Sequence, residues 1–330
     1  MRPDGSARAT DVTCRAVKMS YRRRAVAADA LNRTGPIVVV GSHVAGLVLE
    51  VDAVPREGES VLGRGFSEPE DGGKATNQAV AAAKLGAPVR LVTLLGDDER
   101  GDRWRRILAG YGMDTTFVMQ QAGPTDVGFV LLPPSRIPAI ASSIELSVAL
   151  EAALIERASD ALDDASIVLC QLEAPQGCAL AAFRLARAAG ARTLLNPAPA
   201  QQLGPELLAL TDVLIPNEHE AAVLAGRDGT PGRLAELLSA QIGGAAVIVT
   251  AGADGCYVAT GGPADHLPAP RVTAADTTGA GDAFIGALAV RLRDGEDLRE
   301  AAAFAVRAAA LSVIRPGTMP AYATAGELGP

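Results

Sequence analysis

A glycine-rich segment that runs directly into an apolar stretch near the end of the chain is the strongest sign of chemistry. It reads Asp-Thr-Thr-Gly-Ala-Gly-Asp from Asp276 to Asp282, and residues 283–292 continue as an apolar helix. Backbone N–H groups at such a helix start can face an anion, and the helix dipole adds positive potential. An aspartate there can accept the proton of an attacking hydroxyl, or serve only as a favourable first-turn residue. Because a phosphoryl group in transfer spreads its charge over three oxygens, the segment favours phosphoryl transfer.

The elements that must position this segment form a regular alternation of strands and helices. The predicted strands are residues 37–40, 89–95, 167–172, 193–196, 213–216 and 246–250. The predicted helices are residues 77–85, 101–108, 148–162, 176–189, 205–210, 218–225, 233–242, 280–292 and 298–314. Strands that alternate with helices imply a parallel sheet with right-handed crossovers. Residues 47–54 and 125–132 instead alternate apolar and polar side chains, which predicts a small antiparallel sheet inserted among the early strands.

Composition supports a large α/β protein and disfavours several other classes. The 330 residues are 48% hydrophobic but only 3% aromatic, so Ala, Val and Leu must fill the core. The net charge of −8 argues against a nucleic-acid-binding surface, and we see no apolar run long enough to predict a membrane span. The four cysteines form no CxxC pair and the three histidines are scattered. We therefore expect reduced thiols in the cytoplasm rather than a zinc site or disulfides.

The first 34 residues differ from the rest, because they are rich in arginine and carry no apolar segment of the kind found in a secretory signal. We interpret residues 1–34 as a basic, disordered extension. The alternatives are a true start nearer Met19 and a basic arm that binds an acidic partner. Residues 35–330 are expected to form one domain.

Several further motifs, taken in order, give the chain a resemblance to a known family. Gly72-Gly73-Lys74-Ala75-Thr76-Asn77-Gln78-Ala79 stands early, and Asp276 to Asp282 stands late. Between them come Leu85-Gly86-Ala87, Leu95-Gly96-Asp97-Asp98, Gln171-Leu172-Glu173-Ala174-Pro175, Asn196-Pro197-Ala198-Pro199-Ala200, Pro216-Asn217-Glu218-His219-Glu220-Ala221 and Thr250-Ala251-Gly252-Ala253-Asp254-Gly255. In this order they resemble the ribokinase-like (PfkB-type) carbohydrate kinases across residues 37–321. The resemblance implies a three-layer α/β/α fold with a mainly parallel central sheet, and a small β-sheet lid from segments near 46–66 and 125–141.

The resemblance also implies ATP-dependent phosphorylation of a hydroxyl on a sugar, sugar acid or nucleoside. Asp282 matches the general base, and the backbone of Gly279, Ala280 and Gly281 matches the anion hole. The residues that match the substrate site are Gly72, Gly73, Lys74, Asn77, Glu173 and Asp282. Those that match the nucleotide site are Asn217, Glu220, Thr250, Gly252, Gly255 and Gly281, with the first two organising Mg²⁺. Those that match a K⁺ site are Asp276, Thr278, Ser312, Arg315, Gly317 and Ala321.

Most of these residues also have a structural interpretation when each is taken alone. Asn217 can cap the helix that follows it, and Glu173 can be a solvated carboxylate at a strand end. Gly252 and Gly255 can form an ordinary turn. Only their joint order favours the functional interpretation.

Some positions depart from the family pattern. The family usually places an acidic residue four positions after the Gly-Ser of the first strand, and an Asn two positions before that acid; here these are Gly46 and Val44. A site without these hydroxyl partners discriminates differently, so we expect a substrate other than plain ribose, and Gly46→Asp should raise ribose affinity. His43 is either a replacement polar group or a packing residue. Val306 stands where ribokinases often place an adenine-side Asn, which weakens the case for strict ATP preference.

Other classes of function fit less well. A non-catalytic sugar or nucleotide sensor on the same fold would explain Gly46, but it would not need Asp282. Gly41 and Gly46 do not make the GxGxxG turn of a dehydrogenase, and the residues around Lys74 do not make a Walker motif. An exposed edge of the small sheet would make a homodimer reasonable.

Overall fold

The computed structural model describes residues 35–135 and 139–329. The interpretation of residues 1–34 as a basic extension therefore lies outside the described residues. Within them, no helix is long and apolar enough to cross a membrane.

The central sheet has nine strands in the order β13-β12-β11-β10-β9-β8-β1-β4-β5. These are β1 (Ile37–Val40), β4 (Val89–Gly96), β5 (Val118–Gln121), β8 (Ile167–Cys170), β9 (Arg192–Leu195), β10 (Val213–Leu214), β11 (Ala246–Thr250), β12 (Cys256–Ala259) and β13 (Asp265–Leu267). All pairings from β5 through β11 are parallel, and β12 and β13 add an antiparallel edge. The four residues of β1 are fully buried, as expected for a strand covered on both faces.

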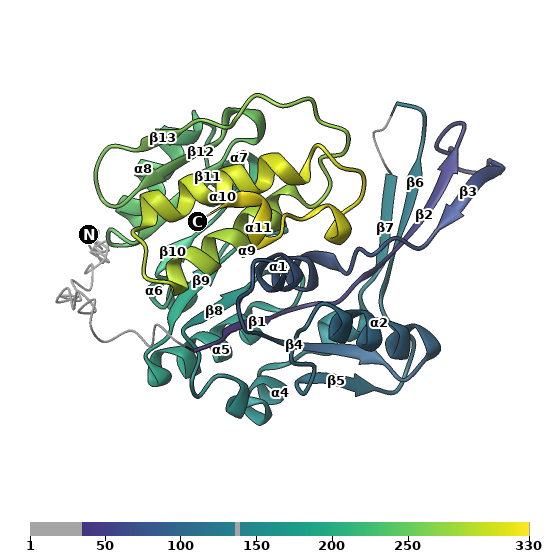
Figure 1. The fold of residues 1–330 in the computed structure, drawn as a ribbon, viewed down its shortest axis with the longest axis horizontal. Helices are drawn as coiled ribbons and strands as arrows, with labels where there is room; N and C mark the ends of the chain where they lie inside the picture. Colours follow the sequence, from purple (N-terminus) through teal and green to yellow (C-terminus); the bar gives the residue numbers. More distant parts are fainter. Residues whose placement is uncertain (1–34, 136–138, 330) are drawn as a thin grey trace, which may run out of the picture. The chain divides into compact units, whose positions relative to one another are not determined.

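Helices cover both faces of this sheet, which gives the three predicted layers (Figure 1). On one face Val39 and Leu91 pack in a cluster with α1 (Gly73–Lys84), α2 (Glu99–Gly110), α9 (Ala280–Arg293) and α10 (Leu298–Ser312). On the other face Val38 and Val40 pack in a cluster with α3 (Glu145–Ala149), α4 (Ala152–Arg157), α5 (Gln176–Ala189), α6 (Pro205–Ala209), α7 (Glu218–Ala225) and α8 (Pro231–Gln241). Because successive strand residues face opposite sides, one short valine-rich strand serves both clusters. A last short helix, α11 (Ala325–Leu328), follows.

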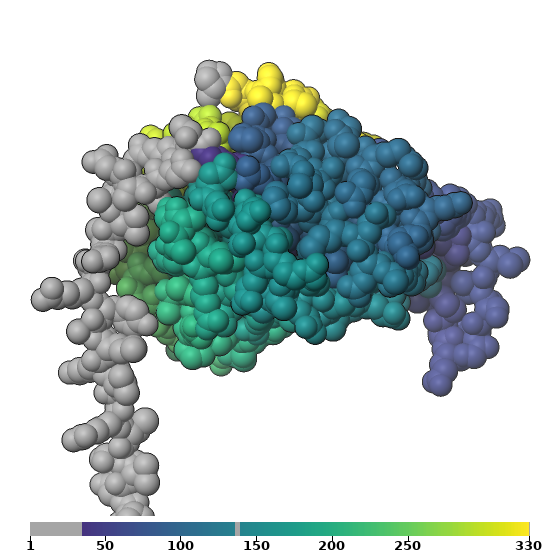
Figure 2. Space-filling model, turned by 90° about the horizontal axis from the view of Figure 1, so that it is seen from below, coloured from purple at the N-terminus to yellow at the C-terminus, as the bar shows by residue number. Residues whose placement is uncertain are grey.

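A second sheet of four strands has the order β3-β2-β6-β7. Its strands are β2 (Ala45–Val51), β3 (Gly63–Ser67), β6 (Val127–Leu132) and β7 (Ala139–Ser143). The β2–β3 hairpin, purple-blue in Figure 2, stands clear of the surface around it. The prediction of a purely antiparallel sheet is wrong, because β2 and β6 are parallel. They are separated along the chain by β3, α1, β4, α2 and β5, and such a long crossover allows parallel pairing that a hairpin cannot make.

The helix predicted over residues 148–162 is also wrong as a single element. Helix α3 ends at Ala149, α4 begins at Ala152, and a 3₁₀ turn follows at Ser159–Ala161. Helix α3 starts earlier than predicted because the Asp126 carboxylate accepts hydrogen bonds from the backbone of Leu146 and Ser147. The break lets both Leu150 and Ile155 reach full burial.

Candidate active site

Five segments far apart in the sequence place polar side chains around one carboxylate, that of Asp282. They are the end of β1, the start of α1, the residues after β8 and β9, and the first turn of α9. Ser42, Gln171 and Asn196 each follow the end of a parallel strand closely. In open α/β sheets the carboxyl ends of parallel strands are the usual place for ligands.

Asp282 lies in the first turn of α9 and is held by two amide side chains of α1. Gln78 donates from Nε2 to Asp282 Oδ1 at 2.9 Å, and Asn77 donates from Nδ2 to Oδ2 at 3.3 Å. Gln78 is positioned in turn by Gln171, which donates to its Oε1, and by Asn196, which accepts from its Nε2 at 3.1 Å. This network fixes the direction in which the carboxylate points.

The electrostatics around Asp282 keep its carboxyl close to the midpoint of ionisation at neutral pH. Burial raises the pKa of Asp282 to about 7, opposed by the charge of Lys74 and the hydrogen bond from Gln78, and supported by Glu173 and Asp71. The carboxyl is only partly exposed. A carboxylate tuned in this way suits proton transfer at neutral pH.

Lys74 and Glu173 form an ion pair beside Asp282. Lys74 Nζ lies 3.5 Å from Glu173 Oε1, while Glu173 Oε2 accepts from Ser42 Oγ at 2.5 Å and from the Lys74 backbone at 3.2 Å. Burial alone would lower the pKa of Lys74, but Glu173, Asp282 and Glu220 together raise it. Lys74 is therefore a firmly protonated cation among three carboxylates.

The backbone at the start of α9 requires glycine at one position and leaves open space at another. Gly279 is the N-cap with φ +72°, and a Cβ there would lie 2.4 Å from Thr318 Cγ2 and 2.5 Å from Tyr322 Oη. A Cβ on Gly281 would meet nothing within 4 Å. Since the first N–H groups of a helix lack partners within it, Gly281 and Asp282 present donors at this open surface, whereas Ala280 N donates to the Thr277 carbonyl at 3.3 Å.

The predicted nucleotide residues other than Gly281 lie at or just after the ends of β10 and β11. Asn217 and Glu220 form a capping box at the start of α7: Glu220 N donates to Asn217 Oδ1 at 2.8 Å, and the Glu220 carboxylate accepts from Asn217 N at 2.8 Å and Nδ2 at 2.9 Å. Asn217 also bridges to Thr250. Gly255, at φ +96°, leaves no room for a Cβ, whereas Gly252 faces open space. The capping role is thus present whatever else these residues bind.

The residues predicted for a monovalent cation lie in two loops that contact each other. Asp276 accepts from Thr278 N at 2.9 Å and from Gly317 N at 3.1 Å. The guanidinium of Arg315 pairs with Glu327 at 2.5 Å. Because a guanidinium has no acceptor, Arg315 could bind a cation only through its carbonyl. Ser312 and Ala321 are buried in the adjoining segment.

Residues 36–325 match the pattern of the pfkB family carbohydrate kinases. The chain belongs to this family. It is 33% identical to the ribokinase of Staphylococcus aureus (strain COL) over 291 residues, which cover 86% of this chain and 95% of the relative. It is 34% identical to the deoxyribokinase of Salmonella typhi over 297 residues, covering 87% and 95%. The structure of Arabidopsis thaliana ribokinase complexed with ribose and ATP has a TM-score of 0.83 and 28% identity, covering 89% of this chain and 97% of that one.

The protein is therefore a carbohydrate kinase, and the predicted family and three-layer fold are confirmed. The sensor alternative loses its support, since the relatives are named as kinases.

His43 of the kinase proves to be a packing residue. Its ring is buried against Trp104, with centroids 4.5 Å apart, and Nδ1 lies 3.0 Å from Thr76 Oγ1. Burial lowers the pKa of His43 to about 3, so the ring is neutral.

Several site residues were missed at the level of sequence. Ser42, Gln78, Gln171 and Asn196 all contact the site, and Asp71 joins it through Asn77. The sequence did contain a signal for them: Ser42, Gln171 and Asn196 are polar residues that closely follow a buried strand, and Gln78 lies one helical turn after Lys74. Val306, the predicted adenine-side position, packs in the core of the kinase.

The residues of the kinase fit the groups that the family implies, with one restriction. Both carboxylate oxygens of Glu220 already accept hydrogen bonds from Asn217, so Mg²⁺ would be held there mainly through its own waters. The open surface beside Gly281 suits an anionic phosphate group.

Proposed function

We propose that the kinase transfers the γ-phosphoryl group of ATP to a hydroxyl of a sugar, sugar acid or nucleoside, with Asp282 as general base. The observation that carries this proposal is the position of Asp282, in the first turn of α9 beside the open backbone of Gly281 and under the amides of Asn77 and Gln78. The base and the anion-binding backbone are thus parts of one helix terminus.

In this reaction the Asp282 carboxylate takes the proton of the acceptor hydroxyl as its oxygen attacks the γ-phosphorus. The new oxygen–phosphorus bond forms while the bond to the β–γ bridging oxygen breaks, and ADP leaves with that electron pair. The N–H groups of Gly279, Ala280 and Gly281 stabilise the charge on the transferred group. Gly72, Gly73, Lys74, Asn77 and Glu173 surround the acceptor.

On the nucleotide side, Thr250, Gly252 and Gly255 form the loop that contacts the ATP phosphates, and Asn217 and Glu220 hold the waters of Mg²⁺. When bound, Mg²⁺ neutralises phosphate charge. We further propose that the loops containing Asp276, Thr278, Ser312, Arg315, Gly317 and Ala321 bind K⁺ through backbone carbonyls. Since these loops adjoin the start of α9, an occupied cation site would hold the anion hole in place.

The test is ADP release with Mg-ATP and K⁺ against a panel of pentoses, hexoses, sugar acids, sugar phosphates and nucleosides. We expect acceptor-dependent release with one class of compound, and a loss of at least 1,000-fold in kcat for Asp282→Asn, in the range for removing an essential base. Nucleotide affinity measured by calorimetry should stay close to that of the wild-type protein. Wild-type turnover by Asp282→Asn would show that Asp282 is not the base. No ADP release with any compound of the panel would contradict the proposed class of acceptor.

A further inference from the structure

Asp71 directly precedes the glycines of α1 and lies against Gly46, the position where the family usually has an acidic residue. Gly46 N donates to the Asp71 carbonyl at 2.9 Å. A Cβ built on Gly46 would lie 3.3 Å from Asp71 Cβ, so a side chain at position 46 would begin in contact with that of Asp71. The place left by the missing acid thus has another acid beside it, supplied by a different segment of the chain.

The Asp71 carboxylate is linked to the catalytic carboxylate by a single amide nitrogen. Asn77 Nδ2 donates to Asp71 Oδ1 at 2.8 Å and to Asp282 Oδ2 at 3.3 Å. The distance between these two carboxylate oxygens is therefore no greater than the sum of the two hydrogen-bond lengths. The backbone N–H of Gly73 also donates to Asp71 Oδ1, at 3.3 Å. Among the described residues, no protein donor is bonded to Asp71 Oδ2. That oxygen is a free acceptor within reach of a ligand bound at Asp282.

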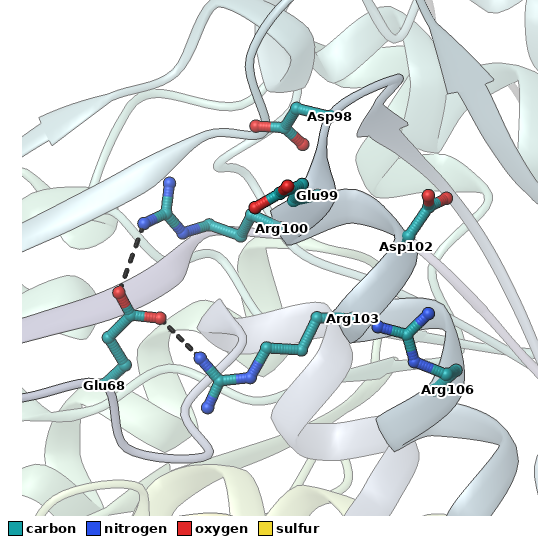
Figure 3. A pocket seen from close by; sticks show the side chains of 7 residues that line it. All are labelled: Glu68, Asp98, Glu99, Arg100, Asp102, Arg103 and Arg106. Atoms are coloured by element: carbon teal, nitrogen blue, oxygen red, sulfur yellow. Dashed lines mark hydrogen bonds and ion pairs between the residues drawn. The ribbon is translucent and has the colours of Figure 1, made fainter.

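The segment that contains Asp71 is anchored on both sides. Figure 3 shows Glu68 between two arginines of α2. Glu68 lies 3.4 Å from Arg100 and 2.5 Å from Arg103, and the charged surface cleft that these residues line has a volume of about 760 Å³. Glu70 accepts from Tyr111 Oη at 2.5 Å. These contacts fix the backbone just before Asp71, and the bond from Gly72 N to Asn77 Oδ1 at 3.1 Å fixes it just after. The partly buried carboxylate is therefore held in position before any ligand arrives.

Glu173, the carboxylate that the family resemblance assigned to the sugar, has less acceptor capacity left. Its Oε2 accepts two protein hydrogen bonds, and its Oε1 faces the Lys74 ammonium. Asp71 and Asp282 also repel each other, since Asp71 is one of the groups that raise the pKa of Asp282. A ligand hydroxyl that donates to Asp71 would relieve part of that repulsion and satisfy the free oxygen.

We propose that Asp71 is a specificity-determining residue that accepts a hydrogen bond from a second hydroxyl of the acceptor, close to the hydroxyl that Asp282 deprotonates. The inference rests on the proposed function and narrows it. The substrate is a polyol with neighbouring hydroxyl groups, and Asp71 provides from a new position the recognition that Gly46 lacks.

The experiment measures KM at saturating Mg-ATP for an accepted sugar and for analogues that each lack one hydroxyl, with the wild-type kinase and with Asp71→Asn. Asn at this position keeps an oxygen for Asn77 and Gly73 but replaces the free acceptor with a donor. In the wild type, loss of one particular hydroxyl should raise KM about 10- to 100-fold. In Asp71→Asn the intact sugar should bind as poorly as that analogue, and removing the same hydroxyl should have no further effect. Glu70→Gln, a neighbouring acid bonded to Tyr111, is the matched control and should behave as wild type.

An unchanged KM for Asp71→Asn, or the same penalty for the missing hydroxyl in both proteins, would overturn the assignment while leaving the kinase activity in place. Failure of the wild type to phosphorylate any polyol would overturn the proposed function, and this inference with it.

A second variant guards against a simple folding defect. Gly46→Asp alone should lower sugar affinity, because it sets a second carboxylate against Asp71, which reverses the expectation from the sequence. Combined with Asp71→Asn, it should restore affinity above that of either single variant. If the effects of Gly46→Asp and Asp71→Asn on KM simply add in the double variant, the two positions do not share a role.

Discussion

As the proposed base, Asp282 would take up and release a proton at neutral pH, and the residues around it shift its pKa in opposite directions. Burial, Glu173 and Asp71 favour the protonated form, whereas Lys74 and the Gln78 amide favour the carboxylate. Lys74 is the strongest candidate for control of this balance, since its ammonium is the main opposing charge. In the proposed reaction, Lys74 would therefore influence proton transfer as well as contact the substrate.

The pH dependence of activity follows from this balance. Since the carboxylate is the active form of the base, kcat/KM should rise with pH through about 7, the pKa of Asp282, and then level off. Steady-state kinetics from pH 5 to pH 9 with an accepted sugar tests this. A flat profile across that range would mean that Asp282 is ionised throughout or is not the base.

The same pKa also makes a prediction for stability. A carboxyl whose pKa is about 7 when folded and 3.8 when unfolded binds its proton more tightly in the fold, so stability falls as the pH rises between these values. Asp282→Asn lacks this penalty, so its Tm relative to wild type should rise by a few degrees from pH 5 to pH 8. The exposed Asp228→Asn should show no such trend, and a constant difference for Asp282→Asn would contradict the raised pKa.

At the scale of elements, the sequence predicted long and repetitive features best. Strand β1 and the alternation from β8 to β11 follow from apolar runs between glycines and prolines, and α5 begins and ends where predicted. Short edge strands such as β5 and β13 were missed because three or four residues carry little pattern. Asp71 was missed for another reason: its importance depends on contact with Gly46, 25 positions earlier, and no local pattern reports such contact.

Substitutions of the two glycines at the start of α9 distinguish an effect on stability from an effect on activity. Gly279→Ala forces a Cβ into Thr318 and Tyr322 at a positive φ, so we expect a Tm loss of several degrees together with reduced activity. Gly281→Ala adds its Cβ to open space within a helix and should keep or raise Tm, because Ala favours helices. Its kcat should nevertheless fall at least tenfold, since the methyl enters the space proposed for the phosphoryl group. Thermal unfolding measures Tm, and ADP release measures kcat. Full activity of Gly281→Ala would mean that the phosphoryl group does not bind beside Gly281.

At the scale of the whole molecule, the small sheet presents an apolar face to solvent. Register places Phe129 opposite Leu47, and Leu49 opposite both Leu131 and Phe66, so these side chains share one face. Phe66 and Phe129 are 62% and 52% exposed. Exposed aromatic groups that cluster in this way are typical of an interaction surface.

We therefore predict a homodimer through the small sheet. Light scattering coupled to size exclusion should give twice the chain mass for the wild type, and Phe129→Glu should shift it to the monomer, because a charge would be buried at the contact. Glu50→Gln, on the opposite face of β2, is the control. A wild-type monomer at micromolar concentration would exclude the dimer.

The connection between β1 and β2 is only residues 41–44, and it contacts the site through Ser42 and Val44. Ser42 binds Glu173, His43 packs on Trp104, and the N–H of Val44 donates to the Gly72 carbonyl at 2.9 Å. Any swing of the small sheet relative to the central one must act on these residues. Trp104 is the one tryptophan in the chain, and His43 packs on it, so its fluorescence reports on this connection. A change in intrinsic fluorescence on adding sugar would show that ligand binding alters the packing between β1 and β2, with no label attached.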